Sequence, residues 1–219
     1  MTGSSGGSRA LLGAVGAEGV RETMPPSKRE GSAAIRPVRD RVLDVATVLF
    51  YRDGIRAVSA DKLIAEVGIS KVTFYRHFPT KDDLVVAYLQ QRSDIEREGL
   101  TRIRRELADD PMAMLRAYTV ALGEVSCAPG FRGCPFINAA AEFADPDHPV
   151  RVTVAEHRRW FSSEIREILA ELGVTDVGSV AEQLILLRDG AMVSGYVGNP
   201  QDASKALTDA LSAIIDAAR

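Results

Sequence analysis

Residues 59–84, SADKLIAEVGISKVTFYRHFPTKDDL, hold two short helical segments separated by a glycine. Ser59 stands before the first segment and Ser70 before the second, and a serine at that position accepts a hydrogen bond from a backbone N–H of the first helical turn. Gly68 lies between the segments, where a tight turn requires a positive φ. We therefore predict two short helices joined by a tight turn, over 60–67 and 71–77.

A longer helix is predicted on each side of this pair. Upstream, apolar residues recur at helical spacing from Val38 to Phe50, and the pair Asp53-Gly54 ends the pattern. Downstream, Thr80 and Asp83 have the spacing of a capping box and open a helix that we expect to run to about Leu107. Two short helices packed on a preceding amphipathic helix are typical of a helix-turn-helix DNA reader.

The second short helix is predicted to expose side chains that suit DNA. Lysine, arginine, hydroxyl and imidazole donors match phosphate oxygens, and valine or threonine methyl groups can contact a thymine methyl in the major groove. The set that we predict to be exposed is Lys71, Val72, Thr73, Tyr75, Arg76 and His77. Phe74 and Phe78 are predicted to be core residues, because large aromatic side chains usually close a small helical core.

This part of the chain is basic, although the whole chain carries a net charge of −3. Residues 27–81 contain eleven Lys and Arg against six Asp and Glu, a net +5, so the remainder carries −8. A basic head on an acidic body is typical of a protein that binds a polyanion. Chance clustering of charge is the alternative interpretation.

Composition indicates a globular protein, with 219 residues of which 46% are hydrophobic and 26% charged. No run approaches the roughly 18 apolar residues that a membrane helix needs, and the apolar patch at 11–17 is too short for a secretion signal. We therefore expect a cytoplasmic protein with no membrane partner.

Cys127 and Cys134 are too few for a disulfide framework. They are either ordinary reduced thiols or a redox-sensitive pair.

Residues 1–35 are predicted to be a disordered tail, because they combine MTGSSGGS, two prolines and Gly31-Ser32 with no sustained periodicity. Lys28, Arg29 and Arg36 at its end could instead form an arm that enters the DNA minor groove. Met24 is an alternative translation start.

The rest of the chain is predicted to be helical, and the fold class is all-α because no alternating run of β-branched residues occurs. Ser179 with Glu182 predicts a second capping box, and Asn199-Pro200 predicts a cap followed by a first-turn proline. The further helices are expected near 111–126, 136–144, 149–173, 179–197 and 200–218.

The stretch VLDVATVLFYRDGIRAVSADKLIAEVGISKVTFYRHFPTKDDL, residues 42–84, resembles the TetR/AcrR family of bacterial transcriptional regulators. The resemblance implies a three-helix helix-turn-helix DNA-binding domain over 36–80, joined by a long helix to a helical ligand-binding and dimerisation domain within 81–219. Val72 stands where many relatives have a glycine, and Ile64 stands where many helix-turn-helix proteins have an alanine. The first departure bears on base preference, and the second on how closely the two short helices approach.

The resemblance also implies which positions contact DNA. They are Ser70, Lys71, Thr73, Tyr75, His77 and Lys81, with Ser59 and Lys62 as further backbone contacts. Among them Tyr75, His77 and Lys81 are expected to bind phosphates. The expected partner is a palindromic double-stranded operator, because a symmetric pair of protein heads reads a symmetric site.

For the second domain the resemblance implies a homodimer formed through the last two helices and a pocket for a small inducer. Gly190, Ser194 and Gly198 recur every four residues, which suits close helix packing either within one chain or between two chains. Side chains around the irregular segment CAPGFRGCPF could line a mostly apolar ligand site or be ordinary core. The candidate lining residues are Tyr118, Phe131, Phe136, Asn138, Phe143, His157, Trp160, Phe161, Arg188 and Met192.

Together with the resemblance, these observations predict a ligand-responsive DNA-binding repressor that a small apolar molecule releases from a palindromic operator. The ligand shifts the population of DNA-competent conformations, and activation stays open. The alternatives are a helical enzyme with a basic tethering head and a sequence-indifferent DNA-packaging protein. No Gly-x-Ser-x-Gly elbow, Walker A loop or His-Glu-x-x-His pair occurs, so we predict no catalytic residues. Glu142, His148 and His157 lack close ligand spacing, so no metal or cofactor is predicted.

Overall fold

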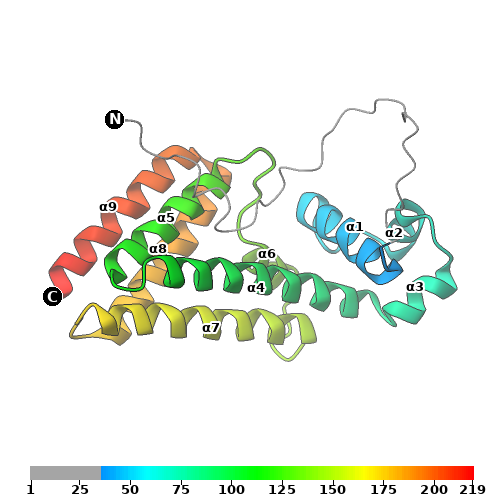
Figure 1. The fold of residues 1–219 in the computed structure, drawn as a ribbon. Coiled ribbons are helices and arrows are strands. Elements are labelled where there is room, and N and C mark those ends of the chain that lie inside the picture. The colour runs from blue at the N-terminus through cyan, green and yellow to red at the C-terminus, as the bar shows by residue number, and fades with distance from the viewer. Residues whose placement is uncertain (1–35) are drawn as a thin grey trace, which may run out of the picture.

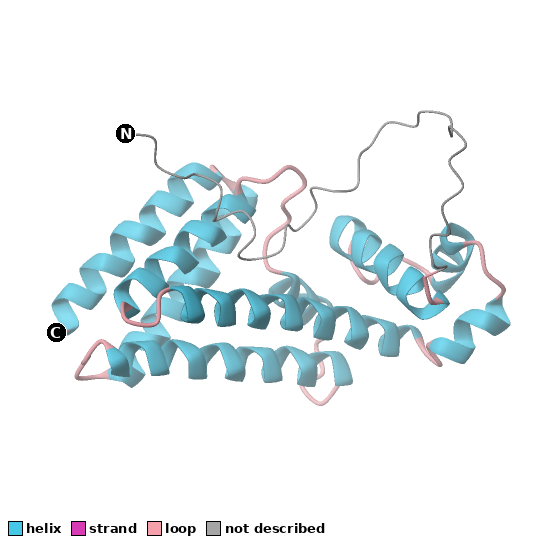
Figure 2. Cartoon of the chain, in the orientation of Figure 1, coloured by secondary structure: helices cyan, strands magenta, loops and turns pink. Residues whose placement is uncertain are grey.

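The structure, a computed structural model, describes residues 36–219, and every regular element in that range is an α-helix (Figure 2). The all-α prediction is therefore confirmed. The helices are α1 Val38–Asp53, α2 Ala60–Val67, α3 Lys71–His77, α4 Lys81–Glu106, α5 Pro111–Ser126, α6 Pro135–Glu142, α7 Pro149–Glu171, α8 Val177–Val197 and α9 Pro200–Ala218. The predicted tail over 1–35, with Met24, Lys28 and Arg29, lies outside the described residues. Arg36 is described, and its guanidinium pairs with the Asp44 carboxylate.

The helices form two regions that share α4 (Figure 1). We call α1–α3, at one end of the molecule, the head, and α5–α9 the body. The first turns of α4 pack against the head, where the rings of Phe50 and Tyr88 meet edge to face with centroids 5.8 Å apart. The later turns of α4 run alongside α7 in the body. A long helix thus connects the two regions without a flexible linker.

The head has a small aromatic core. Phe74 and Phe78 are 0% and 2% exposed, and their ring centroids lie 6.3 Å apart, so the prediction that both are core residues is confirmed. Ile64 is also buried, and the head accommodates this side chain where an alanine is common. Arg41 Nη2 donates a hydrogen bond to the carbonyl oxygen of Val67 at 2.7 Å, which holds the end of α2 against α1.

Most of the predicted helix caps are confirmed. In the capping box of α4, Thr80 Oγ1 accepts from Asp83 N at 3.1 Å and Asp83 Oδ2 accepts from Thr80 N at 2.9 Å. Asn199 caps α9 through Gln201 N at 2.9 Å. These side chains satisfy backbone N–H groups that have no partner inside the helix.

The capping box predicted at Ser179 is wrong. Helix α8 begins two residues earlier, at Val177, and Asp176 Oδ1 accepts a hydrogen bond from Ser179 N at 3.1 Å. An aspartate is as good a cap as a serine, and its negative charge also suits a helix N-terminus. Ser179 therefore lies inside the first turn of the helix.

Two other helix ends differ from the prediction. Helix α6 spans Pro135–Glu142 and stops before Phe143, whose backbone is extended. Helix α7 ends at Glu171, because Gly173 takes a left-handed conformation with a φ of 75° just beyond it. Both helices therefore end two residues before the predicted end.

The body is closely packed around α5, α8 and α9. Ala181 and Ile215 are fully buried, and a Cβ on Gly123 of α5 would clash with the Ser204 side chain of α9. A side chain at position 123 would therefore force the Ser204 side chain to move at this crossing. None of the helices between residues 36 and 219 is long and apolar enough to cross a membrane.

Candidate nucleic-acid interface and effector site

A left-handed glycine forms the turn between α2 and α3. Gly68 has a φ of 70° and a ψ of 46°, and its N–H donates to the carbonyl oxygens of Ile64 and Ala65. Ile69 N also donates to Ile64 O at 3.3 Å. Among the described residues no atom lies within 4 Å of the place that a Cβ would take. The glycine is therefore needed for its backbone conformation and not for space.

Two hydroxyl side chains fix the start of α3. Ser70 Oγ accepts from Thr73 N at 3.1 Å and lies 2.9 Å from Thr73 Oγ1. Ser59 caps α2 in the same way through Lys62 N at 3.1 Å. The predicted caps of both short helices are thus confirmed, and the orientation of α3 follows from its cap at one end and from buried Phe74 in its middle.

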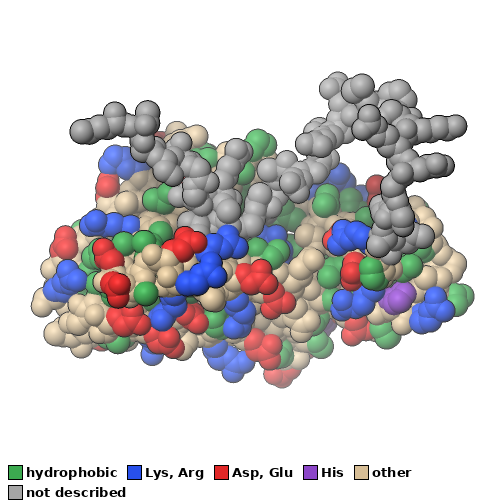
Figure 3. All heavy atoms as spheres, viewed as in Figure 1, with side chains coloured by type: hydrophobic (Ala, Val, Ile, Leu, Met, Phe, Trp, Pro, Cys, Tyr) green, Lys and Arg blue, Asp and Glu red, His purple; other side chains and the backbone are tan. Residues whose placement is uncertain are grey.

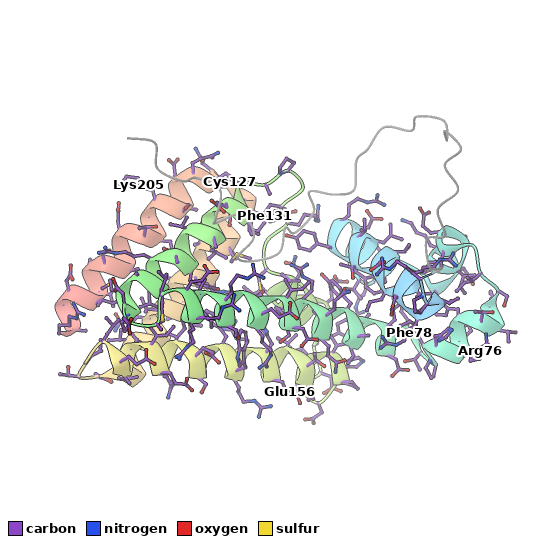
Figure 4. All side chains as sticks on the ribbon, viewed as in Figure 1. Arg76, Phe78, Cys127, Phe131, Glu156 and Lys205 are labelled. Atoms are coloured by element: carbon purple, nitrogen blue, oxygen red, sulfur yellow. The ribbon has the colours of Figure 1, made fainter. Side chains whose placement is uncertain are left out.

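The outer face of α3 is open. Val72 is 79% exposed and Tyr75 45%, while Lys71 and Arg76 are exposed and Thr73 and His77 are half-buried. Figure 4 shows Arg76 pointing away from the molecule and Phe78 lying on the inner side of the helix. In Figure 3 the surface at this end shows Lys, Arg and His side chains together. The predicted exposed set therefore lies on one face, with Thr73 and His77 at its edges.

Two lysines of the predicted interface are paired with carboxylates. Lys71 Nζ lies 2.7 Å from Asp61 Oδ1, and Lys62 Nζ lies 2.9 Å from Asp53 Oδ2. Hydrogen bonds from Arg52 and Lys62 hold the pKa of Asp53 below its usual value. Solvent screens these exposed pairs, so both lysines remain available to another anion.

Lys81, the third predicted phosphate contact, is less open than the outer face of α3. Its side chain is half-buried, and its ammonium lies over the Phe50 ring, 6.0 Å from the centroid. Burial lowers the pKa of Lys81, and the charges of Asp82 and Glu142 oppose that shift. In this structure the ammonium is thus directed toward the contact between head and body.

A carboxylate from the body binds the backbone of the head. Glu142 Oε1 accepts from Ile55 N at 2.9 Å and Glu142 Oε2 accepts from Arg56 N at 2.6 Å. In return, Arg56 Nε donates to the carbonyl oxygen of Glu142 at 2.7 Å. No sequence signal links these positions, because their separation along the chain has no periodic meaning.

Tyr51 of α1 makes the second contact between head and body. Its hydroxyl donates to the carbonyl oxygen of Gly133 at 2.9 Å and accepts from Arg132 N at 2.9 Å. Burial raises the pKa of Tyr51, so the hydroxyl keeps the proton that it donates. The segment before α6 is therefore tied to α1 through its backbone.

Six of the ten predicted pocket residues come together in the body. They are Tyr118, Phe136, His157, Trp160, Phe161 and Arg188. Arg188 Nε donates to Tyr118 Oη at 3.1 Å, Arg188 Nη1 donates to Asp189 Oδ1 at 3.0 Å, and the guanidinium lies 5.1 Å from the Phe161 centroid. The ring of His157 stacks on Phe136 with centroids 3.6 Å apart.

Glu96 of α4 completes this cluster and was not among the predicted residues. Its Oε2 lies 3.4 Å from His157 Nε2 and 3.5 Å from Arg188 Nη2, and neither contact has hydrogen-bond geometry. Burial alone would raise the pKa of Glu96, but the His157 contact and the charge of Arg188 outweigh burial and lower it. Glu96 stands in the charged run DIERE, a pattern typical of a solvated helix face.

The cluster around Arg188 is ionic and nearly filled, which differs from the mostly apolar site that the sequence suggests. Burial raises the pKa of Tyr118 to about 12, so its hydroxyl is neutral beside the guanidinium. The spaces left among these residues measure about 10 Å³ and 20 Å³. Neither space holds more than a water molecule.

The other four predicted pocket residues lie apart from Arg188. Phe143 is buried against His148 and below the Arg56 guanidinium. Asn138 Nδ2 donates to the carbonyl oxygen of Arg132 at 2.8 Å, and Phe131 approaches Gly195. Met192 is buried, and its carbonyl oxygen faces Gly133. These residues belong to the packing of the 131–143 segment.

The two cysteines have different environments. Cys127 is exposed in the loop after α5, where Figure 4 also labels Phe131, and Cys134 is buried. Both are free thiols, and Cys134 Sγ lies 3.6 Å from Arg188 Nη1.

Helices α8 and α9 present an open apolar face. Gly190 and Ser194 are exposed, and with Leu186, which is 71% exposed, they line a groove of about 540 Å³ between the two helices. Gly195 instead packs against Ser126 and Phe131 of its own chain. The small residues of α8 thus lie in two environments, one inside the chain and one on its surface.

A helix-turn-helix head with an open recognition helix, carried on a helical body, defines a DNA-binding transcriptional regulator. Residues 42–88 match the family model described as bacterial regulatory proteins, tetR family. SCO4454, a TetR-family transcriptional regulator from Streptomyces coelicolor, is 37% identical and superposes with a TM-score of 0.79 over 83% of this chain and 95% of that chain.

Two further relatives agree with this match. The regulator sav143 of Streptomyces avermitilis is 28% identical, with a TM-score of 0.71 over 84% of this chain and 98% of that chain. The HTH-type transcriptional regulator LmrA of Bacillus subtilis is 26% identical over 161 residues, which are 73% of this chain and 84% of that protein. The chain belongs to the TetR family of ligand-responsive, DNA-binding transcriptional regulators.

Proposed function

We propose that this protein is a homodimeric repressor that binds a palindromic operator through two copies of α3 and releases it when a small molecule binds. The open outer face of α3 is the observation that carries the proposal, with Val72, Tyr75 and Arg76 exposed at the end of the molecule opposite α9. The major groove of B-DNA admits a helix presented in this way.

Each residue of the interface has a role in this proposal. Val72 and Thr73 contact base edges through their methyl groups, and Tyr75, Arg76, His77 and Lys71 bind phosphates. The flanking backbone contacts come from Ser59, Lys62, Ser70 and Lys81. Lys81 contributes less than the others, because its ammonium must first leave the Phe50 ring.

The α8–α9 face supports a homodimer. Gly190 and Ser194 allow a second helix to approach closely, and Leu186 and Val197, 71% and 72% exposed, supply apolar area for it to cover. A symmetric pair of chains places two heads on two half-sites, which is the arrangement that a palindrome requires. Association of two chains through this face would also cover an apolar surface that costs free energy in water.

The effector acts through the contacts between head and body. Glu142 and Tyr51 tie α1 and the turn after it to residues 132–142. A ligand that prefers one position of this segment shifts the population of head orientations, and its differential affinity limits how far the operator is released.

The proposal is tested first by selection from random duplexes with the purified full chain, followed by affinity measurements at one fixed salt concentration. We expect a palindromic site to be preferred over random DNA by about a thousandfold or more. Equal affinity for both kinds of DNA would favour a sequence-indifferent packaging protein and overturn the proposal.

Variants assign the contacts. Arg76→Ala should weaken binding to all duplexes and reduce the salt slope by about one. Arg166 is an exposed arginine on α7, so Arg166→Ala is the matched control. It should change neither the DNA affinity nor the salt slope. Val72→Ala should alter the selected bases, and unchanged sites would remove Val72 from the set of readers.

A further inference from the structure

A cavity of about 210 Å³ lies where the head meets the body. Its walls include three tyrosine rings and one phenylalanine ring, together with Arg132 and Asn138. The aromatic residues are Phe50, Tyr51, Tyr88 and Tyr196. We call this space the junction cavity, and its volume is at least ten times that of either space beside Arg188.

The size of the junction cavity suits a single substituted ring. An apolar cavity of about 150 Å³ in a protein interior is large enough for benzene. The aromatic walls can stack on such a ring or meet it edge to face. A ligand of this size would touch α1, α4, α6 and α8 at once.

The charges around the junction cavity favour an anion. Glu142 lines the cavity, but both of its carboxylate oxygens already accept hydrogen bonds from Ile55 N and Arg56 N. Arg132 is exposed and lies 5.4 Å from the Tyr196 centroid, with its guanidinium over the ring. The Glu142 carboxylate is thus already hydrogen-bonded, while the Arg132 guanidinium remains open to a ligand.

Arg92 supplies the second observation. It is 7% exposed, and Arg92 Nε has no hydrogen-bond partner among residues 36–219. The carboxylate one turn further along α4, Glu96, contacts His157 and Arg188. The charge of Arg92 also helps to lower the pKa of Glu96. A buried N–H without an acceptor is costly, so an anion that reached Arg92 Nε would gain a charge-assisted contact.

Arg92 does not itself line the junction cavity, but Tyr51 and Tyr88, which do, lie within range of its charge. Arg92 follows Tyr88 by four residues, so both side chains lie on the same face of α4 about one turn apart. Its positive charge lowers the pKa of Tyr51 and of Tyr88, although burial raises both by more. Two rings that line the cavity therefore feel this guanidinium.

We propose that the junction cavity binds a small aromatic carboxylate, whose ring lies among the tyrosines and whose carboxylate pairs with Arg92. The ligand needs a short spacer between its ring and its carboxylate, because Arg92 stands one turn beyond Tyr88 on α4. The ligand would rest directly against Tyr51 and Glu142, the two residues that hold the head. That its binding changes the affinity for DNA rests on the proposed function, whereas the binding itself does not.

The test is calorimetry on the full chain without DNA, with three probes of one shape. The probes are 3-phenylpropionate, its neutral amide 3-phenylpropanamide, and the cation 3-phenylpropylamine. We expect one acid molecule per chain, with the amide and the amine bound at least about tenfold more weakly, because only the acid can pair with Arg92. Absence of acid binding at millimolar concentration, or equal binding of acid and amide, would overturn the proposal.

Two variants locate the site. Arg92→Met keeps an unbranched side chain without the charge and should weaken acid binding at least about tenfold. Ala141→Phe adds a ring at an exposed position of the cavity wall and should abolish binding of the acid. Arg166→Met on α7 is the control and should leave it unchanged.

Acid binding that neither Arg92→Met nor Ala141→Phe affects would place the ligand elsewhere and overturn the proposal. If Arg92→Met does not fold, as judged by circular dichroism, two measurements still test the site. They are acid binding by Ala141→Phe and the ratio of acid to amide affinity in the unchanged chain. A separate titration of the operator complex with 3-phenylpropionate tests the coupling to DNA. If the acid binds the free protein as proposed and the chain selects no operator, the proposed function fails while the ligand site stands.

Discussion

The head and the body are stabilised over different distances along the chain. In the head, Ser59, Ser70, Thr80 and Gly68 each form the turn next to them in the sequence. In the body, Arg188 of α8 contacts residues on α4, α5 and α7 and at the start of α6. The comparison teaches that the head depends on local backbone geometry, whereas the body depends on charges that meet only after folding.

The largest effect should come from removing the central charge of the body. Arg188→Met leaves the largely covered Glu96 carboxylate with fewer partners and should lower the free energy of unfolding by about 3–5 kcal/mol. Urea unfolding followed by the fluorescence of Trp160, the single tryptophan, measures this loss. The double variant Glu96→Gln/Arg188→Met removes both charges and should lose less. Equal losses in the single and double variants would show that the unpaired charge of Glu96 is not the cause of the loss.

Acid should weaken the same cluster by a smaller amount, because protonated Glu96 still leaves Arg188 its contacts with Tyr118 and Asp189. The pKa of Glu96 is lower in the folded protein than in the unfolded chain. Its stabilisation is therefore complete above the unfolded pKa and is lost as pH falls through the folded pKa.

Melting temperature followed by Trp160 fluorescence, from neutral pH to below the usual glutamate pKa of about 4.3, measures this loss. Glu96→Gln should flatten the profile. Asp53→Asn in the head is the control, because the pKa of Asp53 is also lowered but the group is exposed and screened. A profile that Glu96→Gln leaves unchanged would assign the acid sensitivity to other groups.

Breaking the contact between the two regions should have an intermediate effect. In Glu142→Gln the side chain keeps one acceptor, so the hydrogen bond from Ile55 N or from Arg56 N is lost, at a cost of about 1–3 kcal/mol. Hydrogen exchange at these two amides should accelerate, while the amides of α8 stay protected. Glu156→Gln, at an exposed position of α7 labelled in Figure 4, is the matched control. Unchanged exchange at Ile55 and Arg56 would contradict the proposed coupling.

The smallest effect on stability should come from replacing either of two glycines, one in the head and one in the body. This pair also gives the most direct comparison of the two regions. Gly68 in the head and Gly173 in the body have φ values of 70° and 75°, and at both a Cβ would meet open space among the described residues. Either change to alanine should cost about 1 kcal/mol, because the left-handed conformation disfavours a Cβ. Only Gly68→Ala should also weaken DNA binding, measured with the selected operator, because this turn orients α3. Equal DNA affinities of the two variants would contradict that role.

The elements that could be predicted from the sequence are those with a local cause. Serine caps, the Thr80 box and the glycine turns each act on a neighbouring backbone group, so the bounds of α1, α2 and α3 agree with the prediction. The prediction failed at Ser179 because Asp176 offers a competing cap only three residues away. Both Asp176 and Ser179 are good N-cap residues, and the sequence alone does not show which of them caps the helix.

The buried charges could not be predicted, because their partners are distant in the sequence. Glu96 and Arg92 stand among charged residues that read as a solvated face, yet α4 is covered there by the body. The sequence around Glu142 likewise contains no pattern that predicts its contact with Ile55 and Arg56. The candidate pocket was therefore expected to be apolar, while six of its residues surround an ion-pair cluster.

The Glu142 contact has a consequence for exchanging DNA-binding modules between relatives. Two amides of the head obtain their acceptors from a helix that lies beyond any cut made after α3, and Tyr88 of α4 completes the packing around Phe50. A grafted head that left both behind would have unsatisfied N–H groups and an open aromatic core. A functional chimera must therefore transfer the start of α4 and the end of α6 together with the helix-turn-helix.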